Sequence, residues 1–103
     1  MTGVELIHAE RQRQITSEGW TAAHDDEHAE GDLIRAAICY ADNARPWKYR
    51  FGVARITVWP WDIKWMKLTG GPIRNLVKAG ALIAAEIDRI QRINALAESD
   101  ETP

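Results

Sequence analysis

Residues that could face a core recur at helical spacing in three stretches of the chain, which predicts an all-α fold with three main helices. The first helix is expected from Val4 to Thr16, and Gly19 is expected to end it. The stripe expected to face the core consists of Val4, Ile7, Arg11 and Ile15. The other faces carry Glu5, Glu10, Arg13 and Gln14. The segment is therefore predicted to be an amphipathic helix.

The second helix is expected to follow a polar stretch at residues 20–31, with Asp32 as its N-cap. Its core-facing positions fit the i, i+3, i+4, i+7 pattern and are Leu33, Ala36, Ala37 and Tyr40. The helix should end before Pro46, because the residue ahead of a proline is disfavoured in the helical region.

The third and longest helix is expected from Ile73 to about Leu96, with Pro72 in its first turn after a glycine pair. Its apolar stripe contains Ile73, Leu76, Val77, Gly80, Ile83, Ala84, Ile87 and Ile90. Ala79, Leu82 and Ala85 widen the apolar surface, so neighbours are expected on several sides. A second subunit is the simplest source of that cover. Residues 99–103 are expected to form a frayed tail.

Residues 1–98 are predicted to form one helical domain, interrupted at residues 44–71 by an irregular excursion rich in tryptophan and basic residues. Within it, residues 51–58 have the β-branched and aromatic content of a short strand or hairpin, although Pro60 limits any strand there to an edge. A chain of 103 residues buries a modest share of its surface, roughly 60–70%. This small size also favours self-association into a homo-oligomer.

Charge is unevenly distributed along a chain whose net charge is −2. Residues 1–44 carry nine acidic and three basic residues, whereas residues 45–78 carry eight basic residues and one acidic residue. The low net charge argues against general nucleic-acid binding. The basic middle is a candidate anion-binding region.

Cysteine usage and hydropathy bear on the compartment. The single Cys39 excludes an internal disulfide and is expected to be a small buried residue. No charged and then apolar N-terminal run indicates a signal peptide, and no apolar stretch approaches the ~20 residues that a bilayer needs. We therefore expect a cytoplasmic protein without a membrane partner.

A cluster of acidic residues and histidines precedes the second helix. Its members are His24, Asp25, Asp26, Glu27, His28, Glu30 and Asp32. The favoured interpretation is that they cap the next helix and hydrogen-bond locally. The alternatives are contact with a ligand, or a metal site: on a helix, His24 and His28 would face one way, and Glu27 and Glu30 would form an E-x-x-E pair for Mg²⁺.

Tryptophan is unusually frequent, with five residues against one phenylalanine. Trp59, Trp61 and Trp65 lie close together in the basic excursion. Indoles stack on nucleobases, and neighbouring lysine or arginine side chains can meet phosphate. Most of these tryptophans are nevertheless expected to build a small core where no regular element does so. One or two of them are candidates to line a pocket.

Lys78 is a cation on an otherwise apolar helix face. Such a lysine usually extends its charged end to the surface. Together with Arg74, one turn earlier, it could instead hold a phosphate.

The motifs and their order resemble those of a family of small proteins of tailed bacteriophages and prophages. The similar segments are ERQRQ from Glu10, GWT from Gly19, HDDEH from His24, WPW from Trp59 and NLVKAGALIAAEI from Asn75. The resemblance covers residues 10–92 and implies a phage protein that acts in the infected bacterial host cell.

A weaker resemblance is to MazG-like nucleotide pyrophosphohydrolases, all-α enzymes that bind Mg²⁺ and a nucleoside triphosphate. By this resemblance Glu27 and Glu30 would serve as the first acidic pair of the metal site, with Asp32 nearby. The second pair would fall at Asn75 and Lys78, neither of which is acidic. A lysine at a Mg²⁺ position favours an anion instead.

Three hypotheses follow. The first is a phage-encoded binding protein that sequesters a nucleotide or nucleotide-derived immune signal without cleaving it and without a cofactor. Its candidate ligand-binding residues are Trp20, His24, Asp25, His28, Trp59, Trp61, Trp65, Arg74 and Lys78. The second is a Mg²⁺-dependent (d)NTP pyrophosphohydrolase with Glu27, Glu30 and Asp32 as metal ligands. The third is a protein-binding inhibitor of a host factor.

Overall fold

The computed structural model describes residues 1–51 and 58–101 of the chain, and the helices dominate them. The α-helices are α1 (Gly3–Ser17), α2 (Ala22–Asp26), α3 (Asp32–Asn43) and α4 (Gly71–Glu101). Among the described residues of the excursion between α3 and α4, two 3₁₀ turns occur, η1 (Trp47–Tyr49) and η3 (Ile63–Trp65). No strand occurs within the described ranges. The predicted all-α fold with three main helices is confirmed, and α2 is a short addition.

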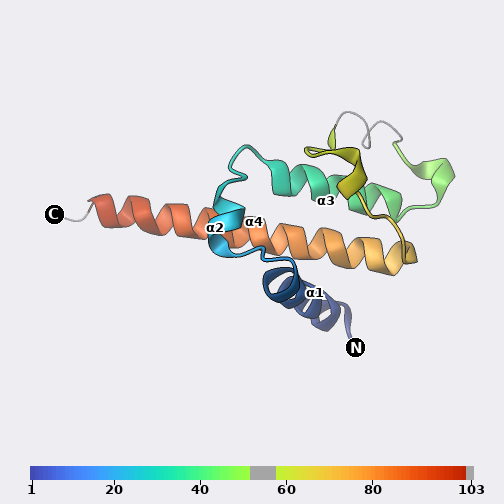
Figure 1. Ribbon diagram of the computed structural model, residues 1–103, viewed down its shortest axis with the longest axis horizontal. Coiled ribbons are helices and arrows are strands. Elements are labelled where there is room, and N and C mark those ends of the chain that lie inside the picture. The colour runs from blue at the N-terminus through green and yellow to red at the C-terminus, as the bar shows by residue number, and fades with distance from the viewer. Residues whose placement is uncertain (52–57, 102–103) are drawn as a thin grey trace.

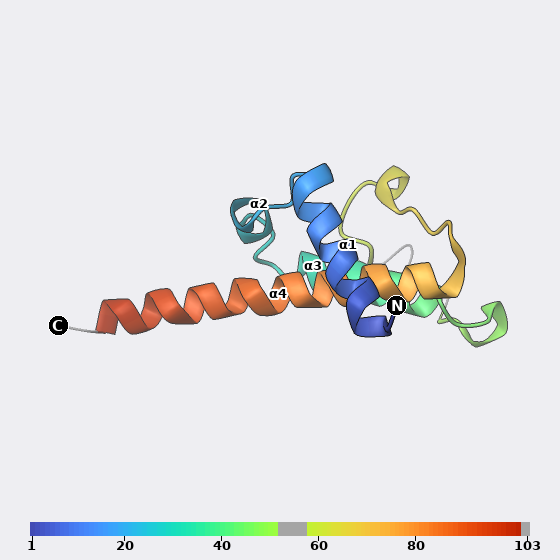
Figure 2. The same ribbon diagram turned by 90° about the horizontal axis from the view of Figure 1, so that it is seen from below.

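The long helix α4 is the centre of the fold. α3 runs antiparallel to the N-terminal half of α4 on one side, and α1 crosses α4 on the other side (Figures 1 and 2). α2 touches α4 near its middle. Beyond that point, the C-terminal part of α4 extends away from the other elements (Figure 1).

The apolar core lies between α3 and α4. The predicted core positions of α3, namely Leu33, Ala36, Ala37 and Tyr40, are all buried, as is Cys39. They pack with Ala79, Leu82 and Ala85 of α4 and with Trp59 from the excursion. The small side chains let the two helices approach closely, and Leu33 and Leu82 fill the space between them.

The prediction for the first helix is right about Arg11, which is buried, but wrong about Val4 and about the faces that carry Glu10 and Gln14. Val4 is 78% exposed, whereas Glu10, Arg11 and Gln14 are the buried residues of α1. The helix therefore buries polar side chains, of which Glu10 pairs with Arg74 of α4, Arg11 pairs with Asp25 of α2 and Gln14 donates to Glu10. Its N-terminus is closed by a capping box between Thr2 and Glu5.

The stripe predicted for the third helix is also only partly buried. Its large members Ile73, Leu76, Ile83, Ile87 and Ile90 are exposed. The helix is instead buried where its neighbours contact it, and its buried residues are Asn75, Val77, Ala79, Ala81, Leu82, Ala85, Glu86 and Arg89.

Two predicted boundaries differ from the structure. Gly31, in a left-handed conformation at φ +83°, occupies the N-cap of α3, so Asp32 is the first residue of the helix and not its cap. α4 continues to Glu101, so residues 99–101 of the expected frayed tail are helical. The strand or hairpin expected at residues 51–58 lies almost entirely outside the described residues.

Candidate functional site

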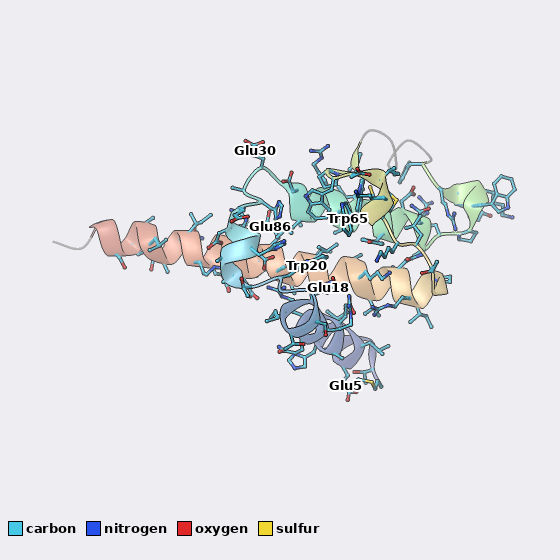
Figure 3. All side chains as sticks on the ribbon, viewed as in Figure 1. Glu5, Glu18, Trp20, Glu30, Trp65 and Glu86 are labelled. Carbon is cyan, nitrogen blue, oxygen red and sulfur yellow. The ribbon has the colours of Figure 1, made fainter. Side chains whose placement is uncertain are left out.

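A cavity of about 660 Å³ opens between α1, the segment at residues 18–28 that contains α2, α3, α4 and the segment that carries Trp59–Lys67. This size is in the range of small-molecule sites, about 300–1,000 Å³. Glu18, Trp20 and Trp65 lie around it and can be found in Figure 3. Its wall contains four of the five tryptophans of the chain.

Six aromatic rings form a continuous series along the wall. Trp20 stacks on His24 with a centroid distance of 5.7 Å, and His24 meets His28 edge-on at 4.9 Å. The series continues through Trp61 at 5.3 Å from His28 and ends with Trp59 and Tyr40. One of the five contacts is stacked and four are edge-on, and the series joins sequence segments that lie far apart.

Local hydrogen bonds hold the two ends of this wall in place. The backbone N–H of Trp20 donates to the carbonyl of Gln14, across a turn in which Gly19 has φ +73°. The indole N–H of Trp59 donates to the carbonyl of Asp62, and the Asp62 carboxylate caps η3 by accepting from the backbone N–H of Lys64. Gly19 and Asp62 thus fix the turns that position Trp20 and Trp59.

The carboxylates on the α1 side are neutralised by arginines. Glu10 accepts hydrogen bonds from Arg13 at 2.8 Å and from Arg74 at 2.6 Å, and Gln14 donates to it as well. Burial would raise the pKa of Glu10, but the hydrogen bonds from Arg13 and Arg74 outweigh burial and hold the pKa below its ordinary value. Arg13 also pairs with Glu18 at 2.8 Å, so this rim carries little unbalanced charge.

Two lysines lie at the other end of the aromatic series. Nζ of Lys78 lies 5.4 Å from the centroid of the Tyr40 ring and donates to the carbonyl of Lys67 at 2.6 Å. Burial, together with the charge of Arg74, lowers the pKa of Lys78. Neither Lys67 nor Lys78 forms a salt bridge with a carboxylate in the part of the chain that the structure describes.

Two buried polar atoms of the wall have no hydrogen-bond partner. They are Oε1 of Gln14, an acceptor, and Nε1 of Trp61, a donor. Buried polar groups without partners are uncommon in folded proteins and each has a cost of about 1–3 kcal/mol. Both side chains line the cavity, but these two atoms are themselves buried.

Seven of the nine predicted ligand-binding residues line this one cavity. They are Trp20, His24, His28, Trp59, Trp61, Trp65 and Lys78. Trp59 is also part of the core, and Trp20 and Trp61 pack against it, which agrees in part with the expected core-building role. Trp65 is 58% exposed at the mouth, and Trp47 lies outside the cavity.

The other two predicted residues have structural partners. Asp25 is fully buried and pairs with Arg11 at 2.7 Å, which ties α2 to α1. Arg74 pairs with Glu10 and lines a second, smaller cavity between α1 and α4. Arg74 and Lys78, the alternative phosphate-binding pair, thus have separate partners, because Arg74 pairs with Glu10 and Lys78 donates to the carbonyl of Lys67.

Sequence reasoning missed several lining residues. Glu10 and Gln14 were placed on solvent-facing sides of α1, and Tyr40 was assigned to the core alone. Lys67 is one of the eight basic residues counted in residues 45–78, and nothing else in the sequence sets it apart. An irregular loop gives no periodicity that would predict which of its cations faces inward, so only the count of basic residues pointed to this segment.

The expected E-x-x-E pair does not share a helix face. Glu27 is the C-cap of α2, and Glu30 lies exposed in the turn before α3, away from the body of the molecule (Figure 3). The carboxylate of Asp32 lies 3.3 Å from Nδ1 of His28. Within residues 1–51 and 58–101, no group of three or more histidine, cysteine or acidic side chains is arranged to hold a metal ion.

Comparisons with models of protein families, with curated proteins and with solved structures found no match to this chain. Among the described residues, no helix has the length and apolar character needed to cross a membrane.

Proposed function

We propose that this protein binds a nucleotide or a nucleotide-derived small molecule in the aromatic cavity and holds it without cleaving it. The observation that carries the proposal is the series of six rings, from Trp20 to Tyr40, that ends at the ammonium group of Lys78. This arrangement supports a ligand that is aromatic at one end and anionic at the other.

Each part of a nucleotide has a matching part of the wall. A nucleobase would stack on indole faces such as that of Trp65, which is worth roughly 1–3 kcal/mol per base. Phosphate oxygens would accept from Lys78 and Lys67, whose charges no described carboxylate neutralises.

The resemblance to tailed-phage and prophage proteins supports a biological role for such binding. A phage-encoded protein that holds a nucleotide-derived signal would lower the free concentration of that signal in the infected cell. The proposed role is therefore counter-defence, by sequestering a nucleotide-derived immune signal of the host.

A ligand panel tests the proposal directly. The purified full-length chain is incubated with nucleoside triphosphates, cyclic nucleotides and ADP-ribose-type compounds in the presence of Mg²⁺, and bound and free fractions are analysed by chromatography. We expect at least one compound to be recovered intact after the protein is denatured. Release of pyrophosphate or another cleavage product would overturn the non-cleaving proposal and favour the MazG-like enzyme. Binding of no compound would overturn nucleotide binding.

Matched variants then locate the ligand. Trp65→Ala removes an indole from η3 at the cavity mouth, whereas Trp47→Ala removes an indole that is 80% exposed in η1, outside the cavity. We expect Trp65→Ala to weaken binding about tenfold or more, since stacking contributes ~1–3 kcal/mol. Trp47→Ala should leave the affinity unchanged. Equal effects would contradict the assignment of the cavity.

Lysine variants test the anionic end in the same way. Lys78→Glu replaces the ammonium group beside Tyr40 by a carboxylate and should abolish measurable binding of a phosphate-containing ligand. Lys48→Glu makes the same charge change at an exposed position outside the cavity and should have little effect. An unchanged affinity in the Lys78 variant would show that the anion lies elsewhere.

One observation favours a second candidate function, a protein-binding inhibitor of a host factor. Trp47, Tyr49 and Phe51 are exposed around η1, and Lys48 and Arg45 lie over two of these rings. Exposed aromatic residues beside cations are typical of protein interfaces. If no nucleotide binds, Trp47→Ala becomes the variant that should abolish capture of a host protein.

A further inference from the structure

The C-terminal half of α4 carries an exposed apolar seam that the rest of the described chain does not cover. The residues of the seam follow one another at steps of four, three, four and three and are Ile83, Ile87, Ile90, Asn94 and Ala97. All five are exposed. This alternation is the a/d spacing of a coiled coil, which keeps one face of a helix turned toward a partner helix.

The crossing of α1 sets where the seam becomes accessible. The same spacing continues toward the N-terminus through Gly80 and Leu76, but Ile7 of α1 lies against Gly80. A Cβ atom added at Gly80 would lie 2.6 Å from Cδ1 of Ile7, so the two helices touch at this point. A partner helix can therefore pack on the seam only from Ile83 onward, along the part of α4 that extends away from the body (Figure 2), so in a parallel pair the two α4 helices separate on the N-terminal side of Ile83.

An extended helical segment of this kind needs support. Single helices shorter than ~12–15 residues are marginal in water, and most helical stability comes from packing of an apolar face. Arg92 connects this segment to the body by donating to the carboxylate of Asp26 and to the carbonyl of Ala22. Beyond Arg92, the apolar residues Ile93 and Leu96 are exposed as well.

We propose that a second copy of this chain occupies the seam, with the two α4 helices parallel and in register. Asn94 is the reason to expect a second copy of the chain on the seam. A buried amide without a partner is costly, but in a parallel in-register pair Asn94 meets the Asn94 of the other copy and the two amides hydrogen-bond. Three isoleucines on the same seam then pack against their own counterparts.

The size of the seam sets the expected strength of association. From Ile83 to Ala97 the helix advances about 21 Å at ~1.5 Å per residue. A single seam of this length buries less area than the about 800 Å² per partner of a standard interface. The expected assembly is therefore weak, with a dissociation constant of the order of 10–100 µM. It does not depend on the proposed nucleotide-binding function.

Analytical ultracentrifugation of the full-length chain between 10 and 500 µM tests the proposal. We expect the average mass to rise from that of the 11.6 kDa monomer toward twice that mass. A mass that stays monomeric at 500 µM would overturn the proposal. This experiment uses no ligand, so its failure leaves nucleotide binding untouched, and failure of nucleotide binding leaves this result untouched.

A matched pair of variants places the contact on the seam. Ile87→Glu puts a carboxylate into the seam, where it would be buried without a counter-charge, and should weaken association at least ~100-fold. Leu96→Glu makes a comparable change on the opposite side of the same helix, nine residues away, and should leave association unchanged. Circular dichroism of both variants in dilute solution checks that the monomer is folded. Equal loss of association in both variants would overturn the seam as the contact.

Cysteine cross-linking tests the orientation without adding charge. In a parallel in-register pair, Asn94→Cys brings two sulfur atoms together, and mild oxidation should convert the chain to a disulfide-linked dimer. Leu96→Cys points away from the seam and should cross-link much more slowly. The native Cys39 is fully buried in the core. Cross-linking of Leu96→Cys at the rate of Asn94→Cys, or none of Asn94→Cys at a concentration where the mass shows association, would overturn the parallel arrangement.

Discussion

The helices α1 and α3 pack against different sides of α4 with opposite chemistry (Figures 1 and 2). α3 buries leucine, alanine, cysteine and tyrosine side chains, which fit closely against the small residues of α4. α1 buries Glu10, Arg11 and Gln14: Glu10 accepts from Arg74 of α4, Arg11 donates to Asp25 of α2, and Gln14 donates to Glu10 one turn away.

The difference explains where the cavity lies. Apolar side chains of varied shape close-pack and exclude water. A network of directional bonds must instead keep its atoms at fixed distances and angles, and Gln14 retains an unpartnered oxygen beside the cavity. The α3 side therefore supplies most of the apolar stability, and the α1 side supplies the polar part of the candidate binding site. Four predictions test this division.

The largest effect is expected on the α3 side. Leu33→Ala removes a fully buried side chain from the core between α3 and α4, and should lower the free energy of unfolding by about 2–5 kcal/mol. Ile38→Ala, on the same helix but 46% exposed, should cost less than about 1 kcal/mol. Urea denaturation followed by circular dichroism measures both. Similar losses in the two variants would mean that α3 does not provide the core of the fold.

The next effect concerns the polar contact of α1. Glu10→Gln keeps the size of the side chain but removes the charge that Arg13 and Arg74 share. Breaking a fully buried ion pair costs ~3–5 kcal/mol. Both arginines are partly exposed and can turn to water, so we expect a loss of about 2 kcal/mol in the same urea experiment.

Glu18→Gln provides the control for this prediction. Glu18 also pairs with Arg13, but its carboxylate is exposed, and such surface pairs contribute ~0–1 kcal/mol. A loss of stability as large in Glu18→Gln as in Glu10→Gln would show that burial of Glu10 is not what makes its contact important.

These two sides of α4 also differ in how far sequence reasoning could reach. The core positions of α3 were predicted correctly because apolar spacing and burial coincide when the partner surface is apolar too. On α1 the same reasoning failed, since burial of Glu10 depends on Arg74, 64 residues away. Helical periodicity contains no information about such a partner. The buried polar face of α1 could be found only from the three-dimensional arrangement.

The candidate site shows the same limit. The number of tryptophans and a lysine on an apolar helix face are unusual enough to be noticed in the sequence. Seven of the residues predicted from the sequence do lie in one cavity. Tyr40 and Gln14 were missed because each already had an ordinary role in a helix. Which tryptophan becomes core, as Trp59 does, and which stays at the mouth, as Trp65 does, depends on turns that residue spacing does not specify.

The third prediction uses pH to distinguish the two sides. The folded-state pKa of Glu10 is lower than its unfolded value of about 4.3, so its ionised form stabilises the fold above that pH. This contribution is lost as the pH falls through the lowered folded-state pKa. The difference in stability between the wild type and Glu10→Gln should therefore be constant near neutral pH and shrink below about pH 4.

The comparison variant for the pH series is Leu33→Ala. Its loss of stability comes from apolar packing and should keep nearly the same size from pH 7 to pH 3. Urea titrations of the three proteins at a set of pH values measure both differences. A Glu10→Gln difference that stays constant down to pH 3 would contradict the assigned role of the ionised carboxylate.

The smallest effect, and the most specific, concerns the point where α1 crosses α4. Gly80→Ala should gain about 1 kcal/mol from helix propensity, but its new Cβ atom would lie 2.6 Å from Cδ1 and 2.9 Å from Cγ1 of Ile7. Overpacking costs ~1–3 kcal/mol, so the net change in the wild type should be a loss of roughly 0–2 kcal/mol. In an Ile7→Ala background both clashing atoms are absent, and the same substitution should stabilise by up to about 1 kcal/mol. The sign of the Gly80→Ala effect is thus expected to reverse between the two backgrounds, which a double-mutant cycle in urea measures. If both backgrounds respond alike, α1 does not cross α4 at this glycine.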